Sequence, residues 1–126
     1  MELNVSGATQ IFDRAALVHT LMGDEALAEQ ITRVFVVDAN AQLVALGQAV
    51  QDGGSPAVRR IGHTMKGAAA SVGATALAEA FGQLETAGRD QNLQDAASAV
   101  QFTEERLRDL ELALRAPRQP QTGTDE

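Results

Sequence analysis

A seven-residue repeat of apolar residues in the C-terminal part of the chain restricts the fold more than any other feature. One set of positions is spaced by seven: Leu93, Val100, Leu107 and Leu114. A second set falls between them: Ala96, Thr103 and Leu110. Alternating steps of three and four residues bring these side chains onto one face of an α-helix. Such a face is buried against other helices, so the repeat predicts a helix bundle.

Earlier stretches also have helical spacing of apolar residues, and residues that start or stop helices separate them. The predicted N-caps are Asp13, Asp24, Ser55, Thr75 and Asn92. The predicted glycine stops are Gly23, Gly73 and Gly88. Because the turns between long helices are short, neighbouring helices should be antiparallel. The sequence therefore predicts an all-α fold, an antiparallel up-down-up-down four-helix bundle with a short extra N-terminal helix.

The second predicted helix, residues 25–51, has a wide apolar face. Its apolar residues with helical spacing are Leu27, Ile31, Val34, Leu43, Leu46 and Val50. Residues 35–37 widen this face near the middle of the helix. We expect the whole set to face the core, because an amphipathic helix directs its apolar stripe inward.

Length and composition indicate one domain over residues 12–115, with a loose lead-in at 1–11 and a disordered polar tail at 116–126. The absence of cysteine excludes disulfides and thiolate metal sites. A net charge of −7 argues against a general nucleic-acid binder. No apolar run approaches the roughly 20 residues that span a bilayer, and no signal peptide is evident. We expect a cytoplasmic protein with no membrane contact.

The third predicted helix, Ser55–Val72, carries one histidine on an unusual face. Its core stripe consists of Val58, Ile61, Met65, Ala69 and Val72. At about 100° per residue, His63 points away from that stripe. Its neighbours one turn away are basic or very small: Arg59, Arg60, Lys66, Gly67 and, further along, Ala70. A solvated helix face normally carries long polar side chains, so this small-residue surface indicates close approach of another molecule.

Residues 63–74 read HTMKGAAASVGA. This run closely resembles the motif of histidine-containing phosphotransfer (HPt) domains, which are four-helix bundles in multistep two-component phosphorelays. The lead-in with Phe12-Asp13 and the stretch Leu84-Glu85-Thr86-Ala87 resemble the same family. The resemblance implies that His63 carries a phosphoryl group between aspartates of receiver domains. It also implies a carrier rather than an autonomous enzyme, with no cofactor of its own and with Mg²⁺ held by the partner receiver.

The residues around His63 suit this chemistry. A neutral imidazole is a nucleophile near pH 7, and the transferred phosphoryl group carries negative charge that a cation such as Lys66 stabilises. Arg59 and Arg60 are candidates for docking an acidic partner. Gly67 and Ala70 leave room for the approaching receiver.

By its spacing in the family motif, Glu85 takes the place where some members have a glutamine beside the histidine. A carboxylate there would accept a hydrogen bond from Nδ1–H and leave Nε2 as the nucleophile. Plain surface charge is the other interpretation of Glu85. His19 lacks any such context and receives no role.

Several alternatives compete with the carrier interpretation. His63 could be an ordinary exposed histidine, or the chain could be a receiver-binding bundle that no longer transfers phosphate. It could also be an HPt domain excised from a hybrid or chemotaxis-type kinase, although the start at Met1 favours a free-standing protein. A metal site is a poor rival, since the two histidines lie far apart. A complete histidine kinase is excluded, because no glycine-rich ATP lid is present. A monomer is the expected state.

Overall fold

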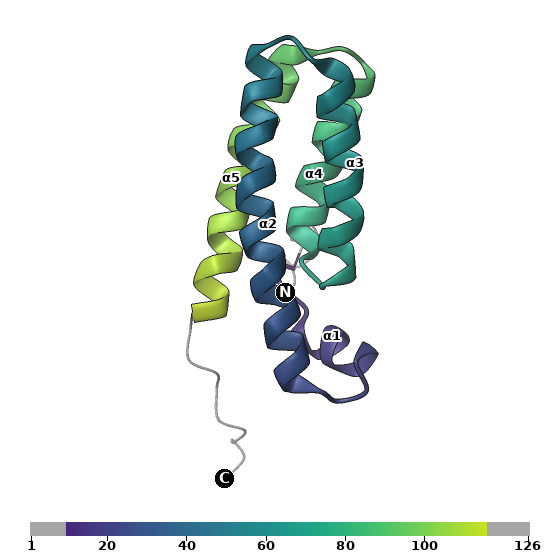
Figure 1. Ribbon diagram of the computed structural model, residues 1–126, viewed down its shortest axis with the longest axis vertical. Coiled ribbons are helices and arrows are strands. Elements are labelled where there is room, and N and C mark those ends of the chain that lie inside the picture. The colour runs from purple at the N-terminus through teal and green to yellow at the C-terminus, as the bar shows by residue number, and fades with distance from the viewer. Residues whose placement is uncertain (1–9, 116–126) are drawn as a thin grey trace, which may run out of the picture.

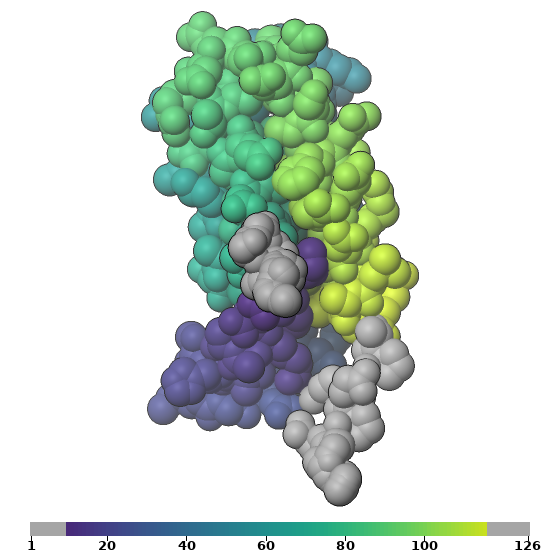
Figure 2. Space-filling view, turned by 180° about the vertical axis from the view of Figure 1, so that it is seen from behind, coloured from purple at the N-terminus to yellow at the C-terminus, as the bar shows by residue number. Residues whose placement is uncertain are grey.

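The structure, a computed structural model, describes residues 10–115 and is helical over most of that length. A short helix, α1 (Arg14–Thr20), precedes four long helices: α2 (Glu25–Gln51), α3 (Ser55–Ser71), α4 (Thr75–Arg89) and α5 (Leu93–Arg115). The long helices run alternately up and down, and α1 lies across the lower end of the bundle (Figure 1). Seen from behind, α4 and α5 lie side by side above α1 (Figure 2). The predicted all-α bundle with an extra N-terminal helix is confirmed.

The predicted tail at 116–126 and most of the predicted lead-in lie outside the described residues. Within the described part, two lead-in residues contact the bundle. The Gln10 carbonyl accepts a hydrogen bond from the Ala76 amide at 2.9 Å, and Ile11 packs against the core. The chain therefore contacts the bundle from Gln10 onward, two residues before the predicted domain start at residue 12.

Three of the five predicted N-caps are confirmed. The carboxylate of Asp13 accepts from the amide of Ala16, and that of Asp24 accepts from the amide of Leu27. The side chain of Asn92 accepts from the amide of Asp95 at 3.0 Å. Each bond satisfies an amide that the first helical turn leaves unpaired.

The other two N-cap predictions are wrong by one residue. Gly54 and Ala74 are the N-caps of α3 and α4, and neither cap is made by a side chain. Ser55 is instead a buried residue of the first turn of α3, where Pro56 follows it. The helices begin at Ser55 and Thr75, so the sequence located both helix starts but misassigned the cap.

Gly88 does not end its helix. It is buried within α4, which continues to Arg89, and Gln91 adopts the left-handed conformation in the turn (φ 56°). A Cβ on Gly88 would overlap the backbone of Arg59 on α3. Gly88 is therefore a contact glycine that lets two helices approach closely, and not a stop. Gly23 and Gly73 do have positive φ, as expected of helix stops.

The core differs from the prediction at the edges of two helices. On α2 the buried residues are Ala28, Thr32, Phe35, Ala39, Leu43 and Leu46. Leu27, Val34 and Val37 are exposed, because the inward face of α2 is narrower than its apolar surface. On α5, Leu114 is exposed, since the last turn of α5 extends below the start of α4 (Figure 1). The rest of the α5 seam is buried from Ala96 to Leu110, and Leu93 is half-buried.

Helices α3 and α4 make the most extensive contact in the bundle. Two glycines, one on each helix, lie in it: Gly62 faces Glu85, and Gly88 faces Arg59. A Cβ on Gly62 would lie 2.6 Å from the amide nitrogen of Glu85 and 3.0 Å from the carbonyl oxygen of Phe81. Because both glycines lack a Cβ, the two backbones approach closely, and this contact fixes the antiparallel register of α3 on α4.

Candidate functional site

His63 projects from the middle of α3, with 70% of its side chain exposed. The stripe on the opposite side of α3 is buried at Val58, Met65, Ala69 and Val72, as predicted. The histidine is therefore held on a rigid helix by a packed core, while its ring remains accessible to a partner molecule.

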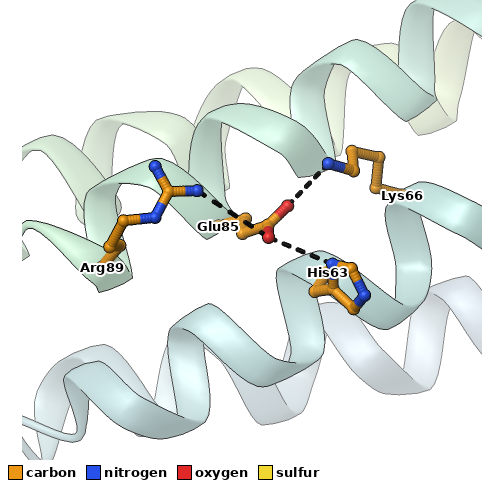
Figure 3. Close-up of polar contacts among 4 residues, drawn as sticks. All are labelled: His63, Lys66, Glu85 and Arg89. Carbon is orange, nitrogen blue, oxygen red and sulfur yellow. Dashed lines mark hydrogen bonds and ion pairs between the residues drawn. The ribbon is translucent and has the colours of Figure 1, made fainter.

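Glu85 of α4 lies beside the histidine ring, with only 11% of its side chain exposed (Figure 3). Its Oε2 is 3.0 Å from Nδ1 of His63. A carboxylate can only accept, so Nδ1 carries the proton and its N–H donates a hydrogen bond to Glu85. In the neutral ring Nε2 then has a free lone pair, and no partner for Nε2 is present among residues 10–115. The contact proposed from motif spacing is therefore present.

Lys66 binds the other oxygen of the same carboxylate. Its Nζ lies 2.8 Å from Oε1 of Glu85, and 46% of its side chain is exposed. The aliphatic part of Lys66 passes over Gly82, where a Cβ would come 3.3 Å from its Cδ. The hydrogen bond from Lys66 lowers the pKa of Glu85, against the opposing effect of burial, and the bond to His63 lowers it further. Glu85 is therefore ionised near neutral pH.

Arg89, which the sequence did not single out, also lies beside Glu85. It lies one turn after Glu85 on α4, and its guanidinium is 3.8 Å from Oε2 (Figure 3). The signal was available, because residues four apart on a helix lie on one face and an acidic residue there pairs with a following basic one. Three basic side chains lie around one carboxylate, from two different helices.

The remaining predicted residues lie on the exposed surface around this cluster. Arg59 and Arg60, with Arg89, line a groove on the N-terminal side of His63. Gly67 and Ala70 are exposed on the C-terminal side. No atom lies within 4 Å of the position that a Cβ on Gly67 would occupy. Gly67 is therefore not a packing glycine between helices, unlike Gly62.

Two further observations bear on the class of protein. None of the helices within residues 10–115 is long and apolar enough to cross a membrane. In the same part of the chain, no three histidine or acidic side chains gather as metal ligands would. The described site is a histidine with an acidic orienting group and nearby cations on the outside of a helix bundle.

Comparisons with known proteins identify this class. The Hpt domain family profile matches residues 30–119. Among solved structures, the chain is similar to histidine-containing phosphotransfer protein B (HptB) from Pseudomonas aeruginosa PAO1, with 25% sequence identity and a TM-score of 0.77. The match covers 86% of this chain and 94% of that chain. No curated protein sequence matches the chain significantly.

The chain belongs to the Hpt domain family. It is a histidine phosphotransfer protein of a phosphorelay, and proteins of this class are phosphocarriers that interact with receiver domains.

Proposed function

We propose that His63 is the residue that carries the phosphoryl group, receiving it from the aspartyl phosphate of one receiver domain and passing it to the aspartate of another. The observation that carries this proposal is the hydrogen bond of 3.0 Å between Nδ1 of His63 and buried Glu85. It holds the proton on Nδ1 and turns the unpartnered Nε2 of an exposed ring towards the partner.

The transfer step follows from this arrangement. The Nε2 lone pair attacks the phosphorus of the acyl phosphate, and a P–N bond forms as the P–O bond breaks. The electron pair of the broken bond leaves with the receiver's carboxylate. The proton on Nδ1 stays in place, where the ionised Glu85 stabilises the positive charge that the ring acquires. Return of the phosphoryl group to a second aspartate reverses each step.

The other predicted residues have supporting roles in this proposal. Lys66 stabilises charge on the phosphoryl oxygens, since the transition state is loose and its negative charge is spread. Arg59 and Arg60 dock an acidic surface of the receiver, and Gly67 and Ala70 leave room for it. Mg²⁺ belongs to the receiver, and the receiver completes the chemistry. We propose that the protein acts as a monomer in the cytoplasm, without ATP-dependent kinase activity of its own.

The test is phosphorylation by receiver domains that carry labelled acyl phosphate, followed by a measurement of acid-labile, base-stable phosphate. Wild type and His19→Gln should take up label, and His63→Gln should not. Label on His63→Gln would place the carrier residue elsewhere. Binding of receivers without any label would indicate a docking module that no longer transfers phosphate.

A further inference from the structure

The cation assigned to the phosphoryl group is already engaged in the unphosphorylated protein. Nζ of Lys66 lies 2.8 Å from Oε1 of Glu85, a distance of a charge-assisted hydrogen bond. Glu85 is bound at Nδ1, and a phosphoryl group on Nε2 would lie on the opposite side of the ring, so Nζ can move towards that group only by lengthening its bond to Glu85. Phosphorylation of His63 therefore changes the surroundings of Glu85 as well as those of the histidine.

Loss of a bound cation is unfavourable for the Glu85 carboxylate. Only 11% of its side chain is exposed, so water replaces a departing partner poorly. A nearly buried carboxylate that loses a charged partner is strongly disfavoured, because the desolvation penalty remains without its compensation. A second cation that could take over the carboxylate would remove this obstacle.

Arg89 is such a cation. Its guanidinium is 3.8 Å from Oε2 of Glu85, within ion-pair range but beyond a hydrogen bond. Half of its side chain is exposed, at 51%, so the side chain has freedom to move closer. It comes from the helix that bears Glu85, whereas Lys66 comes from the helix that bears His63 (Figure 3). Lys66 can therefore follow the phosphoryl group while Arg89 stays with the carboxylate.

The charges of the cluster favour this arrangement, with Lys66 at the phosphoryl group and Arg89 at the Glu85 carboxylate. In the unphosphorylated protein, Lys66 and Arg89 share one carboxylate. When a phosphoryl group is bound to Nε2, the ring keeps its hydrogen bond from Nδ1 to Glu85, and two anionic groups share the same two side-chain cations, Lys66 and Arg89. One cation for each anion is then the arrangement with the least unpaired charge.

On the basis of the proposed function of His63, we infer that Arg89 is a positioning residue for phosphoryl transfer: it takes over the Glu85 carboxylate when Lys66 moves to the phosphoryl group. Arg89 acts through Lys66 and does not itself need to contact the phosphoryl group or the receiver. Its contribution to transfer therefore depends on the presence of Lys66.

This dependence is measured by a double-mutant cycle of Arg89→Ala and Lys66→Ala, with single-turnover transfer from a phosphorylated receiver as the readout. In the wild-type background, Arg89→Ala should lower the limiting rate about fivefold, the size of an ordinary coupling between contacting groups. The receiver concentration at half-saturation should not change. In the Lys66→Ala background, Arg89→Ala should change the limiting rate by less than about twofold.

Three further variants control the cycle. Arg89→Lys should retain most of the rate, and Arg89→Gln, which keeps a long polar stem without the charge, should match Arg89→Ala. Arg108→Ala, at an exposed position on α5, should leave transfer unchanged. Thermal melts of all variants report whether the bundle is intact.

The inference is wrong if Arg89→Ala has no effect on the limiting rate, or lowers it equally in both backgrounds. It is also wrong if the substitution changes only the half-saturating concentration, which would make Arg89 a docking residue. A wild-type protein without label on His63 would overturn the proposed function itself, and the inference with it. The two failures are thus distinguishable.

Discussion

Gly62 lies so close to Glu85 that a Cβ at position 62 would come 2.6 Å from the Glu85 amide nitrogen. This contact brings the backbone of α4 against α3 one residue before His63. The side chain of Glu85 can therefore reach Nδ1 of His63 on one side and Lys66 on the other. Gly62, which has no functional group of its own, thus sets the geometry of the site.

Gly62→Ala should destabilise the bundle and slow transfer. The methyl group would overlap backbone atoms of α4, which move only if the helices separate, so the cost should lie near the upper end of the range for overpacking, about 3 kcal/mol. The gain in helix propensity, about 1 kcal/mol, offsets only part of this cost. The free energy of unfolding, from chemical denaturation, checks the prediction.

The matched control is Gly47→Ala on α2, where no atom lies within 4 Å of the added Cβ. That substitution should raise the free energy of unfolding by about 0.5–1 kcal/mol. Equal effects of the two alanines would show that the close contact at Gly62 does not hold α3 and α4 in place.

Gly67→Gln should abolish or strongly reduce transfer while leaving the bundle folded. No atom lies within 4 Å of an added Cβ, so the new side chain can extend over the surface beside His63 that we propose the receiver covers. Transfer from phosphorylated receivers and a thermal melt are the measurements. Gly47→Gln, the same change at an open position on another helix, should transfer normally; an active, folded Gly67→Gln protein would refute the docking surface.

Lys66→Ala should slow transfer about tenfold without abolishing it. The nucleophile remains, and the loss is smaller than for a fully buried transition-state donor, because the Lys66 side chain is half exposed. Single-turnover rates of the wild type and the variant check this. An unchanged rate would remove the electrostatic role from Lys66.

Glu85→Gln should destabilise the protein near neutral pH and progressively less in acid. The hydrogen bond from Lys66 lowers the pKa of Glu85, so the folded state favours the carboxylate over the acid. This contribution is complete above the ordinary glutamate pKa of about 4.3 and is lost as the pH falls below it, through the lower pKa of the folded state.

Thermal melts between pH 7 and about pH 3 should therefore show a difference in Tm between wild type and Glu85→Gln that shrinks on acidification. Glu104→Gln, an exposed position on α5, controls for the loss of one negative charge. A difference that grows in acid would contradict the sign of the pKa shift.

The ring tautomer gives an independent check of the Glu85 contact. In the ¹⁵N spectrum of the neutral His63 ring, the wild type should show the proton on Nδ1, because the carboxylate accepts from that nitrogen. Glu85→Ala should lose this preference and slow transfer. The ring of His19, which lies on α1 and has no contact with Glu85, should be unaffected by the substitution.

The sequence by itself determined the helices and the face on which His63 lies. Helix periodicity is a local property, so Val58, Met65 and Ala69 identified the inward side of α3 and placed His63 opposite. Asp13, Asp24 and Asn92 located three helix starts, because a cap depends on amides only two or three residues away. The motif after His63 identified the family without any structure.

Only the tertiary structure decided which residues of α4 meet α3. The sequence predicted a helix stop at Gly88 and no role for Gly62. A close contact between helices leaves no periodic signal in either helix, so the sequence does not show that both glycines lie in it. Val34 and Leu114 have core spacing but are exposed, since the neighbouring helices do not cover them. The register set by the two glycines brings Glu85 to His63 and Lys66 of the other helix, because long-range packing fixes those two distances. The third basic neighbour, Arg89, follows from local spacing, since it lies four residues after Glu85 on the same helix.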